Sequence, residues 1–151
     1  MGQSARKTVG GSESTRQRNP GWSVGLRLVR PDQVIDRVEE GFETRTMENL
    51  RARMGLTSDE MSMLLGTSPR TLARRQKKGQ LEPVESDRLY RVARLYERAV
   101  EVFESEDAAR RWFREPVWGL GGKTPLAYAR TDPGAREVEA LLERIEYSVL
   151  A

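Results

Sequence analysis

The residues best suited to chemistry in this chain are five basic side chains within the ten residues 69–78. They are Arg70, Arg74, Arg75, Lys77 and Lys78. An arginine guanidinium can donate two parallel hydrogen bonds to the edge of a guanine, and lysine pairs with phosphate as a point charge. The stretch therefore predicts recognition of a nucleic acid by non-covalent contacts.

Composition argues against most catalytic chemistry. The 151 residues include no cysteine and no histidine, which removes disulfides, thiolate metal sites, the usual general base and the commonest transition-metal ligand. We therefore expect no cofactor, no metal and no enzymatic activity. A distant alternative is an enzyme that relies on carboxylates such as Glu85 and Asp87, which are better explained as charges at the start of a helix.

Two short helices are predicted to position the basic residues. Thr57 and Glu60 have the spacing of a capping box at the start of the first helix. Gly66 and Thr67 form a turn, and Ser68 followed by proline begins the second helix, which ends at Gly79. The first helix buries a stripe made of Met61, Leu64 and Leu65. The pattern is that of a helix-turn-helix.

In such a motif the second helix enters the major groove with its early residues over base edges. We expect Arg70, Thr71 and Arg74 to contact bases. Phosphate contacts are expected from Arg75, Lys77 and Lys78, and from Thr67 and Ser68 at the helix start. The alternative is a solvated basic helix end that complements the helix dipole, and Lys77 and Lys78 fit that alternative well.

The remaining sequence also reads as helical, which predicts an all-α fold. Apolar residues recur at helical spacing at 34–38, 47–54, 86–104 and 107–114, with a start signal at Ser86. The stretch after Gly21 is short and apolar, and we expect an extended segment there. Residues 66–100 carry nine basic and four acidic side chains, which fits a surface that faces a polyanion.

Residues 1–20 are polar and rich in glycine and serine, so we expect a disordered basic N-terminal arm. No apolar run approaches the ~20 residues that a membrane span needs, and no hydrophobic signal core follows the N-terminus. A cytoplasmic location without membrane contact is the expectation.

The last thirty or so residues form a second module with its own turn signals. Gly121 and Gly122 precede Lys123 and a threonine–proline helix start, an arrangement that could also attract a phosphate. Thr131 or Asp132 caps a final helix. Near the end, Tyr147 and the aliphatic residues Val149 and Leu150 either fold back on the core or anchor a partner.

Several segments in this order resemble the antitoxins that join an Xre-type helix-turn-helix to an Xre/MbcA/ParS-like toxin-binding domain. They are SPRTLARRQKKGQLEPVESDRLYRVARLYERAVEVF, AARRWF and GLGGKTPLAYARTDPGAREVEALLERIEY. The resemblance covers residues 25–151, while the N-terminal extension and the segment EPVWGLGG depart from the pattern. It implies a helix-turn-helix domain over 21–104 and a small helical toxin-binding domain over 105–151.

The resemblance also implies a function. Such antitoxins neutralise a toxin with a RES domain, an ADP-ribosyltransferase-like enzyme that consumes NAD, by blocking its active site, and they repress their own operon through operator DNA. By position, Gly121, Gly122 and Lys123 would lie in the inhibitory loop. Arg144, Glu146 and Tyr147 would lie near the entrance of the toxin's site.

A homodimer is expected, because a palindromic operator mirrors a two-fold axis, and helix 86–104 has apolar residues to spare for an interface. The alternative function is a stand-alone helix-turn-helix regulator whose C-terminal module dimerises or binds a ligand.

Overall fold

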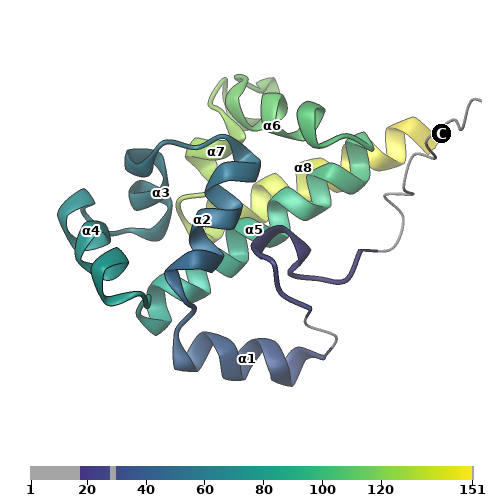
Figure 1. Cartoon of the computed structure of the whole chain (residues 1–151). Helices are drawn as coiled ribbons and strands as arrows, with labels where there is room; N and C mark the ends of the chain where they lie inside the picture. The colour runs from purple at the N-terminus through teal and green to yellow at the C-terminus, as the bar shows by residue number, and fades with distance from the viewer. Residues whose placement is uncertain (1–17, 28–29, 151) are drawn as a thin grey trace, which may run out of the picture.

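The computed structural model describes residues 18–27 and 30–150, with side chains through residue 148 (Figure 1). The predicted all-α fold is confirmed: this part of the chain contains helices and one isolated bridge between Glu43 and Gln80, but no strand. The helices are η2 (Trp22–Val24), α1 (Pro31–Glu40), α2 (Thr44–Met54), α3 (Ser58–Leu65), α4 (Pro69–Lys78), α5 (Pro83–Phe103), α6 (Glu106–Arg114), η3 (Trp118–Leu120), α7 (Pro125–Tyr128) and α8 (Asp132–Leu150).

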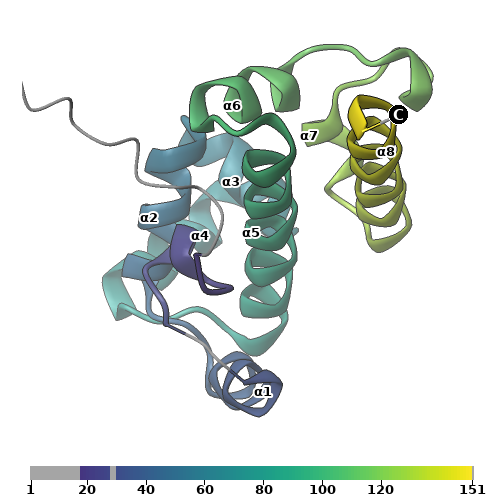
Figure 2. The same ribbon diagram turned by 90° about the vertical axis from the view of Figure 1, so that its right-hand side faces the viewer.

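Helix α5 is the centre of the molecule. In Figure 2 it stands between α2, α3 and α4 on one side and α7 and α8 on the other, and α1 lies against its first half. Buried apolar side chains line both sides of it, so one continuous core joins the two sides of the molecule. Those on α5 itself are Leu89, Val92, Ala93, Leu95, Tyr96, Ala99 and Val100.

Local capping chemistry explains most helix boundaries. The predicted box is present in α3, where Thr57 Oγ1 accepts from the Glu60 N–H at 3.1 Å and Glu60 Oε1 accepts from the Thr57 N–H at 2.9 Å. Ser68 Oγ accepts from the Thr71 N–H at 3.1 Å and so begins α4. Gly55, Gly66 and Gly79 end α2, α3 and α4 with positive φ.

One sequence prediction about a helix start was wrong. Helix α5 begins at Pro83 and not near Ser86, because Glu82 is its N-cap and the Glu82 N–H donates to Glu85 Oε1 at 2.8 Å. The Ser86 hydroxyl is buried inside the helix, where it accepts from the Phe42 N–H at 2.8 Å. Ser86 therefore ties the start of α2 to α5.

The segment after Gly21 is not extended as predicted, because Trp22–Val24 form a 3-10 turn. Glu97 of α5, although 94% buried, holds this turn by accepting from the Gly21 N–H at 3.0 Å and from the Ser23 hydroxyl at 2.8 Å. Arg18 lies 4.3 Å from the Trp22 ring and 3.8 Å from Glu106. Residues 1–17 of the expected arm lie outside the described residues. No helix in the described part is long and apolar enough to cross a bilayer.

Candidate functional site

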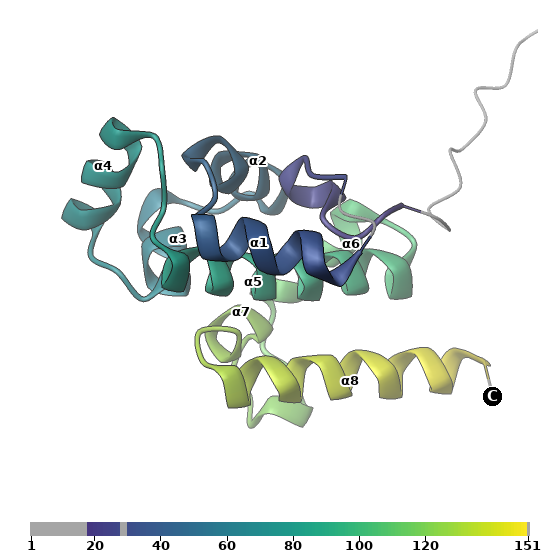
Figure 3. The same cartoon turned by 90° about the horizontal axis from the view of Figure 1, so that it is seen from below.

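Helix α4 stands out from the body of the protein at one end (Figures 1 and 3). Leu72 is its one buried residue. The turn before it is fixed by Arg88 of α5, whose Nη1 donates to the Leu65 carbonyl at 2.9 Å directly over Gly66. A Cβ at Gly66 would lie 2.2 Å from that nitrogen and would displace the guanidinium, and the φ of 67° itself favours glycine at this position.

Four of the five basic residues of α4 form an exposed stripe. Arg70, Arg74, Lys77 and Lys78 follow the spacing i, i+4, i+7, i+8, which places them on one face of a helix. Within the described residues, none of the four makes an ion pair or a hydrogen bond through its side chain. Their charges are therefore available to an external anion.

Arg75 differs from these four. Its Nε lies 2.9 Å from Glu85 Oε1 and its Nη1 lies 3.8 Å from Glu82, with the arginine side chain 17% exposed and that of Glu85 8% exposed. The Arg75 guanidinium is thus already paired inside the protein, and its expected phosphate contact stays a prediction. It fixes the C-terminal half of α4 to the start of α5, and Glu85 has a structural contact in place of a catalytic one.

The polar residues at the start of α4 are partly used by the fold. Ser68 caps the helix and donates its hydroxyl to Thr71 Oγ1 at 3.0 Å. The Thr67 N–H donates to Ser62 O at 3.0 Å. Gln76, not singled out by the sequence, donates to Glu48 of α2 at 3.0 Å and braces the same helix.

The C-terminal module presents its own surface in the loop 117–123. Backbone hydrogen bonds close this loop on itself, among them Val117 N to Lys123 O at 3.0 Å and Gly122 N to Val117 O at 3.1 Å. Gly121 and Gly122 have φ of 63° and 78°, with open space where a Cβ would lie. The two glycines are thus required by backbone conformation, and Lys123 is exposed beside them.

The three residues expected near the entrance of the toxin's site, Arg144, Glu146 and Tyr147, differ in exposure and pairing. Arg144 and Tyr147 are exposed, the tyrosine by 72%. Glu146 is instead ion-paired with Arg98 of α5, which also contacts Glu101 at 3.1 Å. Glu146 therefore holds the last turns of α8 against α5. The side chains of Val149 and Leu150 lie outside the described residues.

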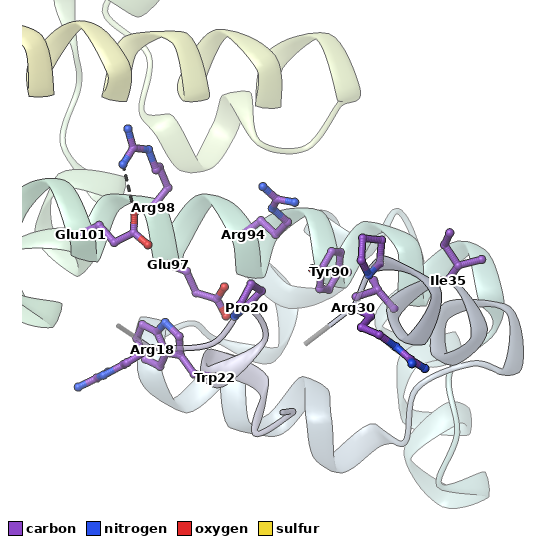
Figure 4. A pocket seen from close by; sticks show the side chains of 12 residues that line it. Arg18, Pro20, Trp22, Arg30, Ile35, Tyr90, Arg94, Glu97, Arg98 and Glu101 are labelled. Carbon is purple, nitrogen blue, oxygen red and sulfur yellow. Dashed lines mark hydrogen bonds and ion pairs between the residues drawn. The ribbon is translucent and has the colours of Figure 1, made fainter. Parts of the chain in front are cut away.

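A hollow of about 390 Å³ lies between η2, α1 and α5 (Figure 4). Its carboxylates are already engaged: Glu97 binds the η2 turn, and Glu101 pairs with Arg98, as the dashed line in Figure 4 shows. Figure 4 also places Tyr90 and Arg94 along its α5 wall. Burial raises the pKa of the Tyr90 hydroxyl. Both carboxylates of the hollow thus have structural contacts.

The two candidate surfaces lie far apart. Helix α4 is at one end of the molecule and the C-terminal end of α8 is at the other, with α8 running alongside α5 between them (Figure 3). A ligand on α4 and a ligand on the end of α8 therefore need not compete for space. The apolar residues of α5 that were expected to serve a dimer interface are buried in the core of a single chain, so that part of the expectation was wrong.

Comparison with known proteins adds the family context. Residues 33–94 match a family model described as the antitoxin Xre-like helix-turn-helix domain. Residues 98–147 match one described as the antitoxin Xre/MbcA/ParS C-terminal toxin-binding domain. The boundary between the two models falls inside α5.

Curated relatives named antitoxin Xre cover most of the chain. One from Yersinia enterocolitica is 29% identical over 130 residues, 85% of this chain and 88% of the relative. One from Photorhabdus laumondii is 28% identical over 138 residues, which are 89% of this chain and 93% of the relative. One from Pseudomonas putida is 32% identical over 119 residues, which are 78% of this chain and 74% of the relative.

Proposed function

Because this chain belongs to the Xre family of antitoxins, we propose that it neutralises a RES-domain, NAD-consuming toxin and represses its own operon. As a member it is an antitoxin with a DNA-binding helix-turn-helix and a toxin-binding domain. The proposal adds the class of toxin, the mode of inhibition and the control of transcription. Neutralisation proceeds by occlusion, with the antitoxin covering the toxin's active site and contributing no chemistry of its own.

The exposed groups of the C-terminal module support occlusion. Tyr147 and Arg144 project from the last turns of α8, and Lys123 projects from the closed loop 117–123. An exposed aromatic ring and two exposed cations can occupy a cleft, because the ring fills apolar space and the cations pair with acidic groups on the toxin. In this proposal Gly121 and Gly122 give the loop its shape, and Glu146 positions the helix end.

The unpaired stripe on α4 supports operator binding, and it is the observation that carries this half of the proposal. In this proposal Arg70, Arg74 and Thr71 contact base edges. The phosphates are contacted by Lys77, Lys78, Thr67 and Ser68. Arg75 holds α4 in place through Glu85, and its predicted phosphate contact is open to a mutational test. A palindromic operator would be read by a homodimer, whose interface uses surface residues other than the buried ones of α5.

Co-expression tests the toxin half. The neighbouring toxin candidate is produced with the full-length chain and with a chain ending at Arg144, while growth and cellular NAD are followed. Rescue by the full-length chain alone places neutralisation in the last residues. Rescue by both chains moves the inhibitory contact towards Lys123. No rescue by either would contradict the proposal and favour a stand-alone regulator whose C-terminal module dimerises or binds a ligand.

Glu146→Gln, in the full-length chain, is the matched control for that truncation. Ending the chain at Arg144 removes Tyr147 and also the carboxylate that pairs with Arg98. If Glu146→Gln neutralises the toxin while the truncation does not, the loss belongs to the exposed groups and not to a loosened helix.

A further inference from the structure

Trp118 is the most exposed of the large apolar side chains that the structure describes. Its side chain is 96% exposed. The other two tryptophans are packed: Trp22 lies against Tyr96, with ring centroids 6.0 Å apart, and Trp112 lies against Phe103 at 5.5 Å. An indole presents about 150–250 Å² of surface, and folded chains ordinarily bury most of it. The exposure of Trp118 therefore calls for a physical cause.

The backbone around Trp118 is rigid. The residue opens η3, and its carbonyl accepts from the Gly121 N–H at 3.1 Å. Leu120 N donates to Val117 O at 3.0 Å, and Lys123 N donates to Leu120 O at 3.2 Å. Together with the bonds that close the loop at Val117, these contacts tie the two ends of the loop 117–123 to each other.

The residues that follow Trp118 pack against the body of the protein. Leu120 is 1% exposed and anchors the loop in the core. The backbone of Gly119 lies against Leu141 of α8, since a Cβ at Gly119 would lie 3.4 Å from a Leu141 methyl. With both following residues held against the body of the protein, the Trp118 side chain is held in solvent. The backbone that carries the indole is thus pre-organised, so little backbone entropy is lost when a partner buries this aromatic group.

We infer that Trp118 is the central anchor of the toxin interface and inserts its indole into an apolar recess on the toxin. The inference rests on the proposed function, and it adds a residue outside the set assigned to toxin binding above. Trp118 lies inside residues 98–147, which match the toxin-binding family model, whereas the exposed Ile35 is outside that range. Tryptophan is enriched among residues that dominate binding energy when they fill a pocket.

The surroundings of Trp118 specify the rim of the recess. Lys123 lies in the same closed loop, is exposed, and makes no side-chain ion pair within the described part of the chain. The matching toxin surface is therefore a recess large enough for an indole with a carboxylate at its edge. A recess of this chemistry discriminates tryptophan from smaller apolar residues by the volume left unfilled.

Trp118→Ala is the direct test, with binding to the purified toxin measured by calorimetry. We expect the dissociation constant to rise by about thirtyfold or more, as hot-spot truncation does, and Trp118→Phe to recover part of that loss. Because the indole is almost fully exposed, the melting temperature should remain that of the wild type. Val84→Ala, which trims a 60% exposed residue at the start of α5, is the matched control and should bind normally.

Quenching of tryptophan fluorescence by iodide provides a second readout. In the free antitoxin one tryptophan should be fully accessible, this accessible fraction should be absent in Trp118→Ala, and it should disappear when toxin is added to the wild type. Unchanged affinity in Trp118→Ala, or quenching that persists in the complex, would overturn the inference.

The controls separate this inference from the function on which it rests. If wild-type protein neutralises the toxin and Trp118→Ala does so equally well, the anchor is wrong and the antitoxin proposal stands. If the wild type itself fails to bind or neutralise the RES-domain candidate, the proposed function fails first. Light scattering measures whether the protein self-associates. A Trp118→Ala variant that loses self-association but keeps its affinity for the toxin would show that the indole contacts a second copy of this chain. That result would overturn the inference.

Discussion

Arg114 and Glu60 form a two-pronged ion pair across 54 residues of sequence, with Nη1–Oε2 and Nη2–Oε1 both at 2.9 Å. Glu60 belongs to the capping box of α3, and Arg114 is the last residue of α6. Arg114 Nη2 also donates to the carbonyl of Gly55, at 2.6 Å. The end of α6 is thereby clamped to the start of the helix-turn-helix.

This clamp should make part of the stability depend on pH. The hydrogen bond from Arg114 is the main reason that the pKa of Glu60 lies below its ordinary value of 4.5; burial opposes the shift and the Thr57 N–H supports it. A carboxyl whose pKa is lowered by folding stabilises the protein above that ordinary value, and the contribution is lost as pH falls through the lowered pKa. Glu60→Gln should therefore cost about 1 kcal/mol at pH 7, since the pair is partly solvated.

Urea unfolding at pH 7 and near pH 3 measures this contribution. The difference between wild type and Glu60→Gln should shrink at the lower pH, because protonation of Glu60 removes the charge that pairs with Arg114. A difference that stays constant between the two pH values would mean that the ion pair contributes no stability.

Arg74→Ala should weaken operator binding by about tenfold to a hundredfold and relax sequence preference, because a bidentate contact to a base carries about 1–3 kcal/mol of discrimination. Toxin neutralisation should be unchanged, since α4 lies at the opposite end from the tip of α8 (Figure 3). Titration of operator and scrambled DNA at several salt concentrations is the measurement. Loss of both activities in a folded variant would contradict the separation of the two surfaces.

Arg75→Ala should behave differently from Arg74→Ala although the two residues are adjacent. It leaves Glu85, 8% exposed, without its partner at 2.9 Å, and we expect the free energy of unfolding to fall by about 2 kcal/mol. Thermal unfolding of Arg74→Ala and Arg75→Ala measures this difference in stability. If Arg75→Ala keeps wild-type stability and loses DNA affinity with a reduced salt slope, the arginine is a phosphate contact after all.

Gly134→Ala and Gly122→Ala should differ in severity. A Cβ at Gly134 would lie 1.9 Å from the carbonyl oxygen of Tyr128, so the α7–α8 turn must open and stability should fall by about 3 kcal/mol. A Cβ at Gly122 meets open space and is opposed only by the φ of 78°, which costs about 1 kcal/mol. Equal melting temperatures for the two variants would show that the turn before α8 tolerates displacement.

Tyr147→Ala should weaken toxin binding by about tenfold or more without lowering the melting temperature, because the side chain is 72% exposed on a helix held by Glu146. Glu146→Gln should show the opposite pattern, with a lower melting temperature and near-normal affinity. Calorimetric titration with toxin and thermal scans of the two variants form the test. A Tyr147→Ala variant that binds normally would remove the C-terminal ring from the interface.

The sequence predicted those features whose causes are local. The helices over 58–65 and 69–78 follow from caps and glycines within a few residues of each end, and the structure has them at those bounds. The start of α5 was misplaced because Ser86 resembles a cap, whereas its partner is Phe42, 44 residues away. The 3-10 turn at Trp22 depends on Glu97, more than 70 residues away, so no nearby pattern indicates it.

The candidate sites were predictable to a similar extent. Basic residues at 70–78 could be recognised as a group, but the pairing that separates Arg75 from Arg74 depends on how α4 meets α5. Glu146 appeared free in the sequence because its partner Arg98 is 48 residues away. Exposure of Trp118 was equally hidden, since an indole near a glycine-rich loop is as compatible with a core residue as with a surface one.

Helix α5 has a consequence for how this protein can diversify. Its buried residues belong to the packing of both the DNA-binding side and the α6–α8 side, and the two matched family models meet within it. A hybrid antitoxin that takes its first half from one relative and its second from another must therefore inherit an α5 complementary to both. Exchange of specificity between relatives is expected to proceed by substitutions on the exposed stripe of α4 and the loop 117–123, and not by recombination of whole halves.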